Sequence, residues 1–158
     1  DRRQRQMCIR DRNQKASAKK GEHFVLVGHG TYTPSTAIYS QMDYMLKANG
    51  LNNFHVGTIE GYPSFETTLA QLKAGKAKQV TLVPFMFVAG DHAKNDIAED
   101  WKEALEKEGY TVNVRMEGLG QVPEIQEIFI NHIRFMLKHR ILDIMEKKAG
   151  YAAGKDVE

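Results

Sequence analysis

The chain has almost no cysteine and no long apolar run. Its single cysteine, Cys8, excludes an internal disulfide and a cluster of thiolate metal ligands. No apolar run approaches the ~18 residues that span a bilayer, and no apolar segment of the kind found in secretory signals follows the basic residues at the start. With 42% hydrophobic and 27% charged residues, the composition is typical of a soluble globular protein. We therefore expect a cytoplasmic location and no membrane partner.

The signatures of nucleotide binding and of serine hydrolases are also missing. The segment GHGTYT at 28–33 would need glycine in place of Thr33 to match G-x-G-x-x-G, and G-x-x-x-x-G-K-[ST] occurs nowhere. No serine lies in a G-x-S-x-G turn. No nucleotide cofactor is therefore expected. An ordinary nucleotide-binding α/β domain with incidental histidines stays open as an alternative.

The excess of positive charge is confined to the first twenty residues. Residues 1–20 carry eight lysines and arginines against two aspartates, and residues 21–158 carry a net charge of −4. A basic arm can bind nucleic acid or an anionic membrane, but this one has almost nothing to bury. We predict that residues 1–21 are a disordered leader or a non-native scar and that residues 150–158 are a flexible tail. No nucleic acid is predicted as a partner.

Strand and helix patterns alternate through residues 22–149, which we predict to form one domain. β-rich runs occupy 23–28, 53–61, 79–85 and 111–118, and helical patterns occupy 36–50, 65–75, 96–109 and 123–148. Apolar stripes mark the first helix (Ile38, Met42, Met45 and Leu46) and the third (Ile97, Trp101 and Leu105). This alternation predicts an α/β three-layer sandwich, with a four-stranded parallel sheet and helices on both faces.

Side chains with metal-binding chemistry follow three of the predicted strands. His29, Glu60 and His92 come after the first, second and third strands, each within two residues of a glycine. Ligands of parallel α/β sheets bind beyond the carboxyl ends of the strands. Two imidazoles and a carboxylate suit a divalent transition metal and leave a position open for substrate. Each residue alone is more often an ordinary solvated side chain, so the hypothesis rests on their joint placement.

Three motifs together resemble the anaerobic cobaltochelatase family. They are LVGHGT, GTIEGYPSFE and LVPFMFVAGDHAKNDIAED, at the ends of the first three strands, and the resemblance runs from about residue 24 to about residue 142. Members of this family insert Co²⁺ into sirohydrochlorin, an acidic tetrapyrrole, in anaerobic cobalamin synthesis without ATP. The resemblance implies that His29 and His92 bind the metal and accept protons. It also implies that Glu60 completes the metal site.

Such a reaction would use further residues at the same edge. The tetrapyrrole loses two pyrrole protons as the metal enters, and neutral imidazole, with a reference pKa of about 6.5, can accept them. We expect apolar packing on the macrocycle from the strand ends and a cation at the rim for its carboxylates. The residues concerned are Tyr32, Tyr62, Pro84, Phe85, Phe87 and Lys94.

The sequence resembles only the carboxyl-terminal half of the longer family members. A complete site would then need an amino-terminal half or a second copy of this chain, because a short class of chelatase works as a homodimer of single halves. Two alternatives remain open. One is a half-domain that binds metal or tetrapyrrole without catalysis, and the other is insertion of iron or nickel into the same tetrapyrrole.

Overall fold

The computed structural model describes residues 21–90, 93–138 and 144–154. The chain divides into two compact units, Asp1–Ile125 and Gln126–Glu158, which are treated separately. The single domain predicted over 22–149 stays a prediction. Within the described residues, no helix is long and apolar enough to cross a bilayer.

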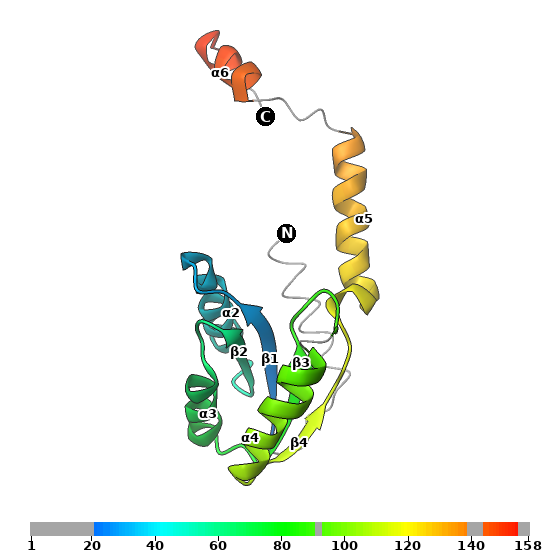
Figure 1. The fold of residues 1–158 in the computed structure, drawn as a ribbon. Helices are drawn as coiled ribbons and strands as arrows, with labels where there is room; N and C mark the ends of the chain where they lie inside the picture. The colour runs from blue at the N-terminus through cyan, green and yellow to red at the C-terminus, as the bar shows by residue number, and fades with distance from the viewer. Residues whose placement is uncertain (1–20, 91–92, 139–143, 155–158) are drawn as a thin grey trace. The chain divides into compact units, whose positions relative to one another are not determined.

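The first unit contains the predicted four-stranded parallel sheet. Its strands are β1 (Glu22–Gly30), β2 (Phe54–Glu60), β3 (Gln79–Pro84) and β4 (Thr111–Val114), and their order in the sheet is β2-β1-β3-β4 (Figure 1). Two boundaries differ from the sequence prediction. β1 extends to Gly30 and so includes His29, whereas β4 ends four residues before the predicted end at 118.

The helices follow the predicted order, with one change of type. The predicted third helix starts three residues earlier than expected and opens as a π-helix before it becomes α-helical. The elements are η1 (Pro34–Thr36), α2 (Ala37–Ala48), α3 (Phe65–Ala74), the π-helix η2 (Ala93–Trp101), α4 (Lys102–Lys107) and the short turn η3 (Leu119–Gln121).

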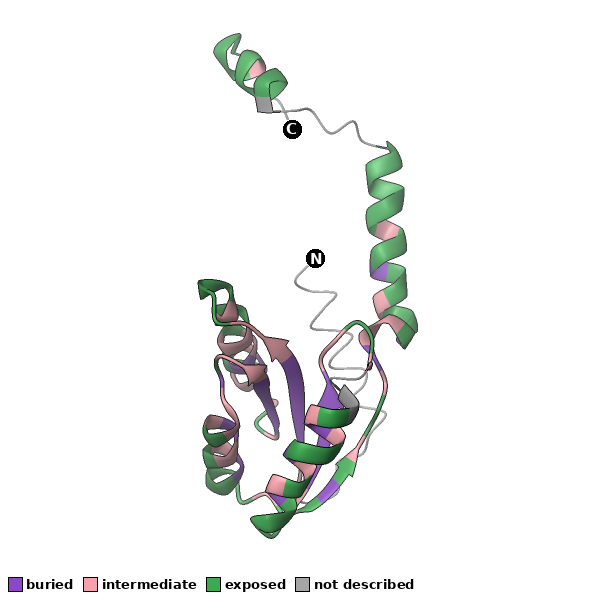
Figure 2. Ribbon diagram, viewed as in Figure 1, coloured by how far each residue is buried: buried purple, intermediate pink, exposed green. Residues whose placement is uncertain are grey.

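The two faces of the sheet carry different apolar clusters, as the alternation of side chains along a strand requires. Val25 and Val27 pack with residues of α3, η2 and α4, among them the predicted stripe of Ile97, Trp101 and Leu105. Phe24 and Leu26 pack on the opposite face with Leu46 of α2. Helices therefore cover both faces, and the strands between them are the most buried part of the unit (Figure 2). The predicted three-layer α/β sandwich is confirmed.

The stripe predicted for α2 is partly wrong. Ile38 is 60% exposed, while Asp43 is buried beside Leu46. The Asp43 carboxylate accepts a hydrogen bond from the backbone N–H of Val56 (3.0 Å), on the edge strand β2. It also accepts from the side-chain amide of Gln71 (3.1 Å) and pairs with Lys47. Since Gln71 belongs to α3, these bonds join the helices of both sheet faces around the edge strand.

A buried pair of histidines continues this network. Nδ1 of His23 lies 2.9 Å from Nε2 of His55, and the two rings stack with an interplanar angle of 4°. Nδ1 of His55 lies 2.9 Å from Oε1 of Gln71, which also accepts from Lys47 (3.0 Å). Because the amide oxygen only accepts, His55 Nδ1 and His23 Nδ1 both carry protons. Burial lowers the pKa of His55 to about 4 and also lowers the pKa of His23.

The helical region after η3 differs from the single helix predicted at 123–148. The structure describes α5 (Pro123–Lys138) and α6 (Ile144–Ala152), and residues 139–143 lie outside the described part. The predicted end at 148 is wrong, because α6 continues to Ala152. On α5, large apolar side chains including Phe129, Ile133 and Met136 are about half exposed.

Candidate functional site

His29 and Glu60 lie at the carboxyl ends of neighbouring strands. Gly30, which follows His29, pairs with Glu60 in the parallel register of β1 and β2. The side chains of His29 and Glu60 are half-buried. The parallel pairing confirms the prediction that the carboxyl ends of β1 and β2 lie at the same edge of the sheet.

Glycine permits the loops behind these two residues to touch. Gly30 has φ +79°, and a Cβ there would lie 1.8 Å from the carbonyl oxygen of Glu60. Gly61 has φ +81°, and its Cβ would lie 2.3 Å from the carbonyl oxygen of Thr31. Neither the dihedral angle nor the space suits a larger residue. The loops are also joined through Thr36, whose hydroxyl donates to the carbonyl oxygen of Tyr62 (2.9 Å).

The His29 ring is oriented by the backbone. Its Nδ1 lies 3.2 Å from the carbonyl oxygen of Gly30. A carbonyl oxygen only accepts, so Nδ1 is the donor and the lone pair of the neutral ring lies on Nε2. Histidines that bind metals through one ring nitrogen commonly donate a hydrogen bond from the other in this way, which fixes the orientation of the ring.

The alternation of side chains limits how His29 and Glu60 can share a ligand. His29 follows Val27 by two residues, and Val27 belongs to the cluster packed under α3 and α4. Glu60 follows Phe54 and Val56 in the same phase, and both belong to the cluster packed under α2. The two side chains therefore start from opposite faces of the sheet. An ion bound by both must lie beyond the end of the sheet.

The position of β1 in the sheet makes this edge a good place for a ligand. The chain moves from β1 to β2 on one side and then returns to β3 on the other. Ligands of open α/β sheets bind beyond the carboxyl ends at such a reversal of strand order. His29 ends β1, one of the two strands at the reversal. The loop that begins after β3, the second of these strands, leads to His92.

Part of the predicted site lies outside the described residues. His92 and the side chain of Lys94 belong to this part that is not described. Among the residues that the structure describes, no three His, Cys, Asp or Glu side chains gather as metal ligands. The predicted set of His29, Glu60 and His92 therefore stays a prediction.

The aromatic residues predicted to contact the substrate differ in accessibility. Tyr32 is 82% exposed, and Tyr62 and Phe87 are about half exposed. Phe85 is half-buried against the cluster under α2. Pro84 must be corrected, because its side chain is less than 2% exposed and has no surface to offer a ligand. It closes the core at the end of β3.

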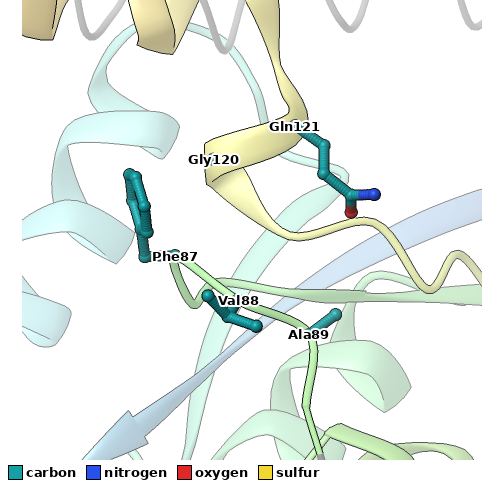
Figure 3. Close-up of a pocket in the computed structure, with 5 residues that line it drawn as sticks. All are labelled: Phe87, Val88, Ala89, Gly120 and Gln121. Atoms are coloured by element: carbon teal, nitrogen blue, oxygen red, sulfur yellow. The ribbon is translucent and has the colours of Figure 1, made fainter.

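A hollow of about 400 Å³ opens beside the loops that follow β3 and β4. It is lined by Phe87, Val88, Ala89, Gly120 and Gln121 (Figure 3). The N–H groups of Leu119 and Gly120 donate to the carbonyl oxygens of Met86 (2.8 Å) and Phe87 (2.9 Å). Sequence reasoning missed Gln121, since only this pairing of two loops brings it next to Phe87.

The chain matches the profile of the cobalt chelatase (CbiK) family over residues 1–138. It belongs to the cobalt chelatase (CbiK) family. This confirms the resemblance drawn from the three motifs. The matched range includes residues 1–20, and the leader or scar predicted for residues 1–21 stays a prediction.

Two curated relatives carry related names. The chain is 32% identical over 142 residues to the sirohydrochlorin cobaltochelatase of Salmonella typhimurium, covering 87% of this chain and 52% of the relative. It is 30% identical over 122 residues to the sirohydrochlorin cobaltochelatase CbiKC of Nitratidesulfovibrio vulgaris, covering 75% of this chain and 43% of the relative. The chain thus spans about half the length of the curated relatives it matches.

Two solved structures share the fold. A CbiX protein of Marinobacter aquaeolei VT8, named for cobalamin (vitamin B12) biosynthesis, aligns with a TM-score of 0.61 at 23% identity, covering 74% of this chain and 98% of that one. The sirohydrochlorin chelatase SirB of Bacillus subtilis subspecies spizizenii, in complex with cobalt, aligns with a TM-score of 0.50 at 18% identity, covering 62% and 43%. The α/β chelatase-like fold is therefore established.

Proposed function

We propose that this chain inserts Co²⁺ into sirohydrochlorin without ATP, as one half of the active unit. The observation that supports the proposal is that β1 and β2 end together, with Gly30 paired to Glu60, so that the strands carrying His29 and Glu60 reach the same edge of the sheet; β1 is also one of the two strands at the reversal of strand order. Because the chain belongs to the cobalt chelatase (CbiK) family, metal insertion is the reaction that we propose for this edge. The names of both curated relatives favour the same substrate.

In this proposal the metal is a substrate that the site holds and releases. His29, Glu60 and His92 bind Co²⁺ beyond the end of the sheet, with Nε2 of His29 as the coordinating atom. Three protein ligands leave coordination positions open, so the pyrrole nitrogens can bind the ion there and then displace the protein ligands. The carboxylate of Glu60 offsets the positive charge of the ion.

Metal entry also requires that two protons leave the macrocycle. As the metal passes from protein to ring, Nε2 of His29 regains a lone pair that can accept a pyrrole proton. His92 plays the same part in the proposal. The hydrogen bond from Nδ1 of His29 to Gly30 keeps the ring in one orientation through this exchange.

The macrocycle would pack against the exposed aromatic residues at the same edge. Tyr32, Tyr62 and Phe87 each expose half or more of their surface after β1, β2 and β3. Phe85 supports the edge from beneath, and Lys94 is the proposed cation for the rim carboxylates. These contacts would hold a flat ligand over the metal while leaving the ring nitrogens accessible.

We further propose that a second copy of this chain completes the site. The chain spans about half of its curated relatives, yet the Marinobacter chain of the same fold is almost entirely covered by the match to this one. The fold is therefore also found in a solved chain of about the matched length, which supports the proposal. The half-length match also favours a second candidate, a half-domain that binds metal or tetrapyrrole and is inactive without an amino-terminal half.

The test is anaerobic visible absorbance of sirohydrochlorin mixed with Co²⁺ and the full chain. We expect insertion above the uncatalysed rate, and at least a hundredfold loss of kcat/KM in His29→Ala. His132→Ala, at an exposed position of α5, is the matched control and should keep the wild-type rate.

The outcomes separate the candidates. Equal insertion by wild type and His29→Ala would refute the role of His29. Binding of sirohydrochlorin without insertion would favour the non-catalytic half-domain. Sedimentation of the active species as a monomer would contradict completion by a second copy.

A further inference from the structure

The described parts of the loops after β3 and β4 are joined to each other at the edge of the proposed site. Two backbone hydrogen bonds join Leu119 and Gly120 to the loop that starts at Phe85. A Cβ on Gly118 would lie 2.7 Å from the carbonyl oxygen of Phe87, so the two backbones are in direct contact. A Cβ on Gly120 would lie 3.0 Å from the Phe87 ring. The exposed ring is thus held beside η3.

Gln121 closes the other side of the hollow and has a fixed amide orientation. Its Oε1 lies 2.9 Å from the backbone nitrogen of Gly118. Since a backbone N–H can only donate, the amide oxygen must face Gly118 and the NH₂ group must point away from it. Figure 3 shows this side chain extending from η3 toward Val88 and Ala89, with Phe87 on the other side of Gly120. The side chain is exposed.

The hollow therefore combines an apolar wall with an oriented pair of N–H donors. Phe87 is 56% exposed and Val88 70% exposed, which suits contact with a flat, unsaturated ring. An amide NH₂ beside such a wall suits a hydrogen-bond acceptor on the rim of that ring. A carboxylate accepts the strongest hydrogen bonds of the common rim groups.

We propose that Gln121 determines specificity for an acidic macrocycle by donating its amide N–H to a rim carboxylate, while Phe87 and Val88 contact the ring beside it. This inference rests on the proposed function, and it adds a contact that neither the sequence motifs nor the metal site requires. Gln121 acts in binding and does not take part in proton or metal transfer.

Gln121→Glu isolates this role. A glutamate keeps the length of the side chain and an oxygen that accepts from Gly118, so the turn stays capped and the fold intact. It replaces the donor NH₂ with a negatively charged oxygen, which repels a carboxylate. Gln41→Glu makes the same change at an exposed position of α2 and is the matched control for net charge.

The experiment is a titration of the full chain with sirohydrochlorin in the absence of metal, followed by absorbance. We expect Gln121→Glu to raise the Kd at least tenfold and Gln41→Glu to leave it within twofold. The difference should shrink in 0.5 M salt, which screens repulsion between charges. In the insertion assay the KM should rise and kcat at saturation should stay within twofold.

Two results would overturn the inference, and a third would overturn the proposed function. An unchanged Kd in Gln121→Glu, with tight binding by wild type, would refute the role of Gln121 alone. An equal rise in Gln41→Glu would refute it as well, since the effect would then come from net charge. Failure of wild type to bind sirohydrochlorin would refute the proposed function itself.

Discussion

Acid should destabilise the first unit through His55. Burial lowers the pKa of His55 to about 4, and the charges of Lys47 and His23 lower it as well. The hydrogen bond to Gln71 and the charge of Asp43 act in the opposite direction and offset only part of this effect. The folded chain therefore keeps the imidazole neutral at a pH where the unfolded chain protonates it.

The size of the effect follows from proton linkage. In the unfolded chain the histidine has a pKa of about 6.5. Between pH ~6.5 and ~4 the unfolded state binds a proton that the folded state does not, so the free energy of unfolding falls as the pH falls. A pKa lowered to about 4 corresponds to about 3 kcal/mol over the whole window, with a slope of up to ~1.4 kcal/mol per pH unit. Burial lowers the pKa of His23 too, which adds to the slope in the upper part of the window.

Urea denaturation followed by circular dichroism, at pH 7.5, 6.5, 5.5 and 5.0 and constant ionic strength, measures this slope. His55→Gln should be less stable than wild type at pH 7.5, because it loses well-packed hydrogen bonds, but its stability should depend less on pH. His132→Gln, at an exposed position of α5, is the control for losing a histidine as such. A slope in His55→Gln equal to that of wild type would refute the reasoning, and so would constant wild-type stability between pH 6.5 and 5.

Two further substitutions test the packing around the edge strand and the site. Gly30→Ala should destabilise the chain by about 3 kcal/mol by urea denaturation, because it combines a positive φ with a Cβ 1.8 Å from the Glu60 carbonyl oxygen. Gly50→Ala is the matched control, since it has φ +81° with nothing within 4 Å; a similar loss in both would show that the contact has no effect. Asp43→Ala should cost about 2 kcal/mol and increase the hydrogen exchange of the Val56 amide, which loses its acceptor. Unchanged protection of that amide would contradict the bond.

The period of the apolar residues was enough to predict the layers. The β-rich run of β1 and the 3.6-residue stripe of Ile97, Trp101 and Leu105 depend only on local sequence, and both are confirmed. The cap of α3 is local too, because Ser64 directly precedes the helix and its hydroxyl accepts from the N–H of Thr67. Such features need no knowledge of what packs against them.

Features that depend on tertiary contacts could not be predicted in this way. Asp43 was not among the residues predicted to be buried on α2, because its partner, the Val56 N–H, is available only where β2 forms the edge of the sheet. Gln71 gave no signal because its two partners lie on α2 and β2. Pro84 was assigned to the substrate surface because the sequence does not show how deeply a residue at the end of a strand is buried. In the structure its side chain is buried.

The order of the strands also explains why the proposed site is bordered by two pairs of joined loops. The loops after β1 and β2 are joined by the glycine contacts at Gly30 and Gly61 and by Thr36. The loops after β3 and β4 are joined by backbone hydrogen bonds at Leu119 and Gly120. The two pairs meet between β1 and β3, where the strand order reverses. A ligand bound in the proposed site would bridge these two surfaces, and the contacts between their described residues would lower the entropic cost of binding.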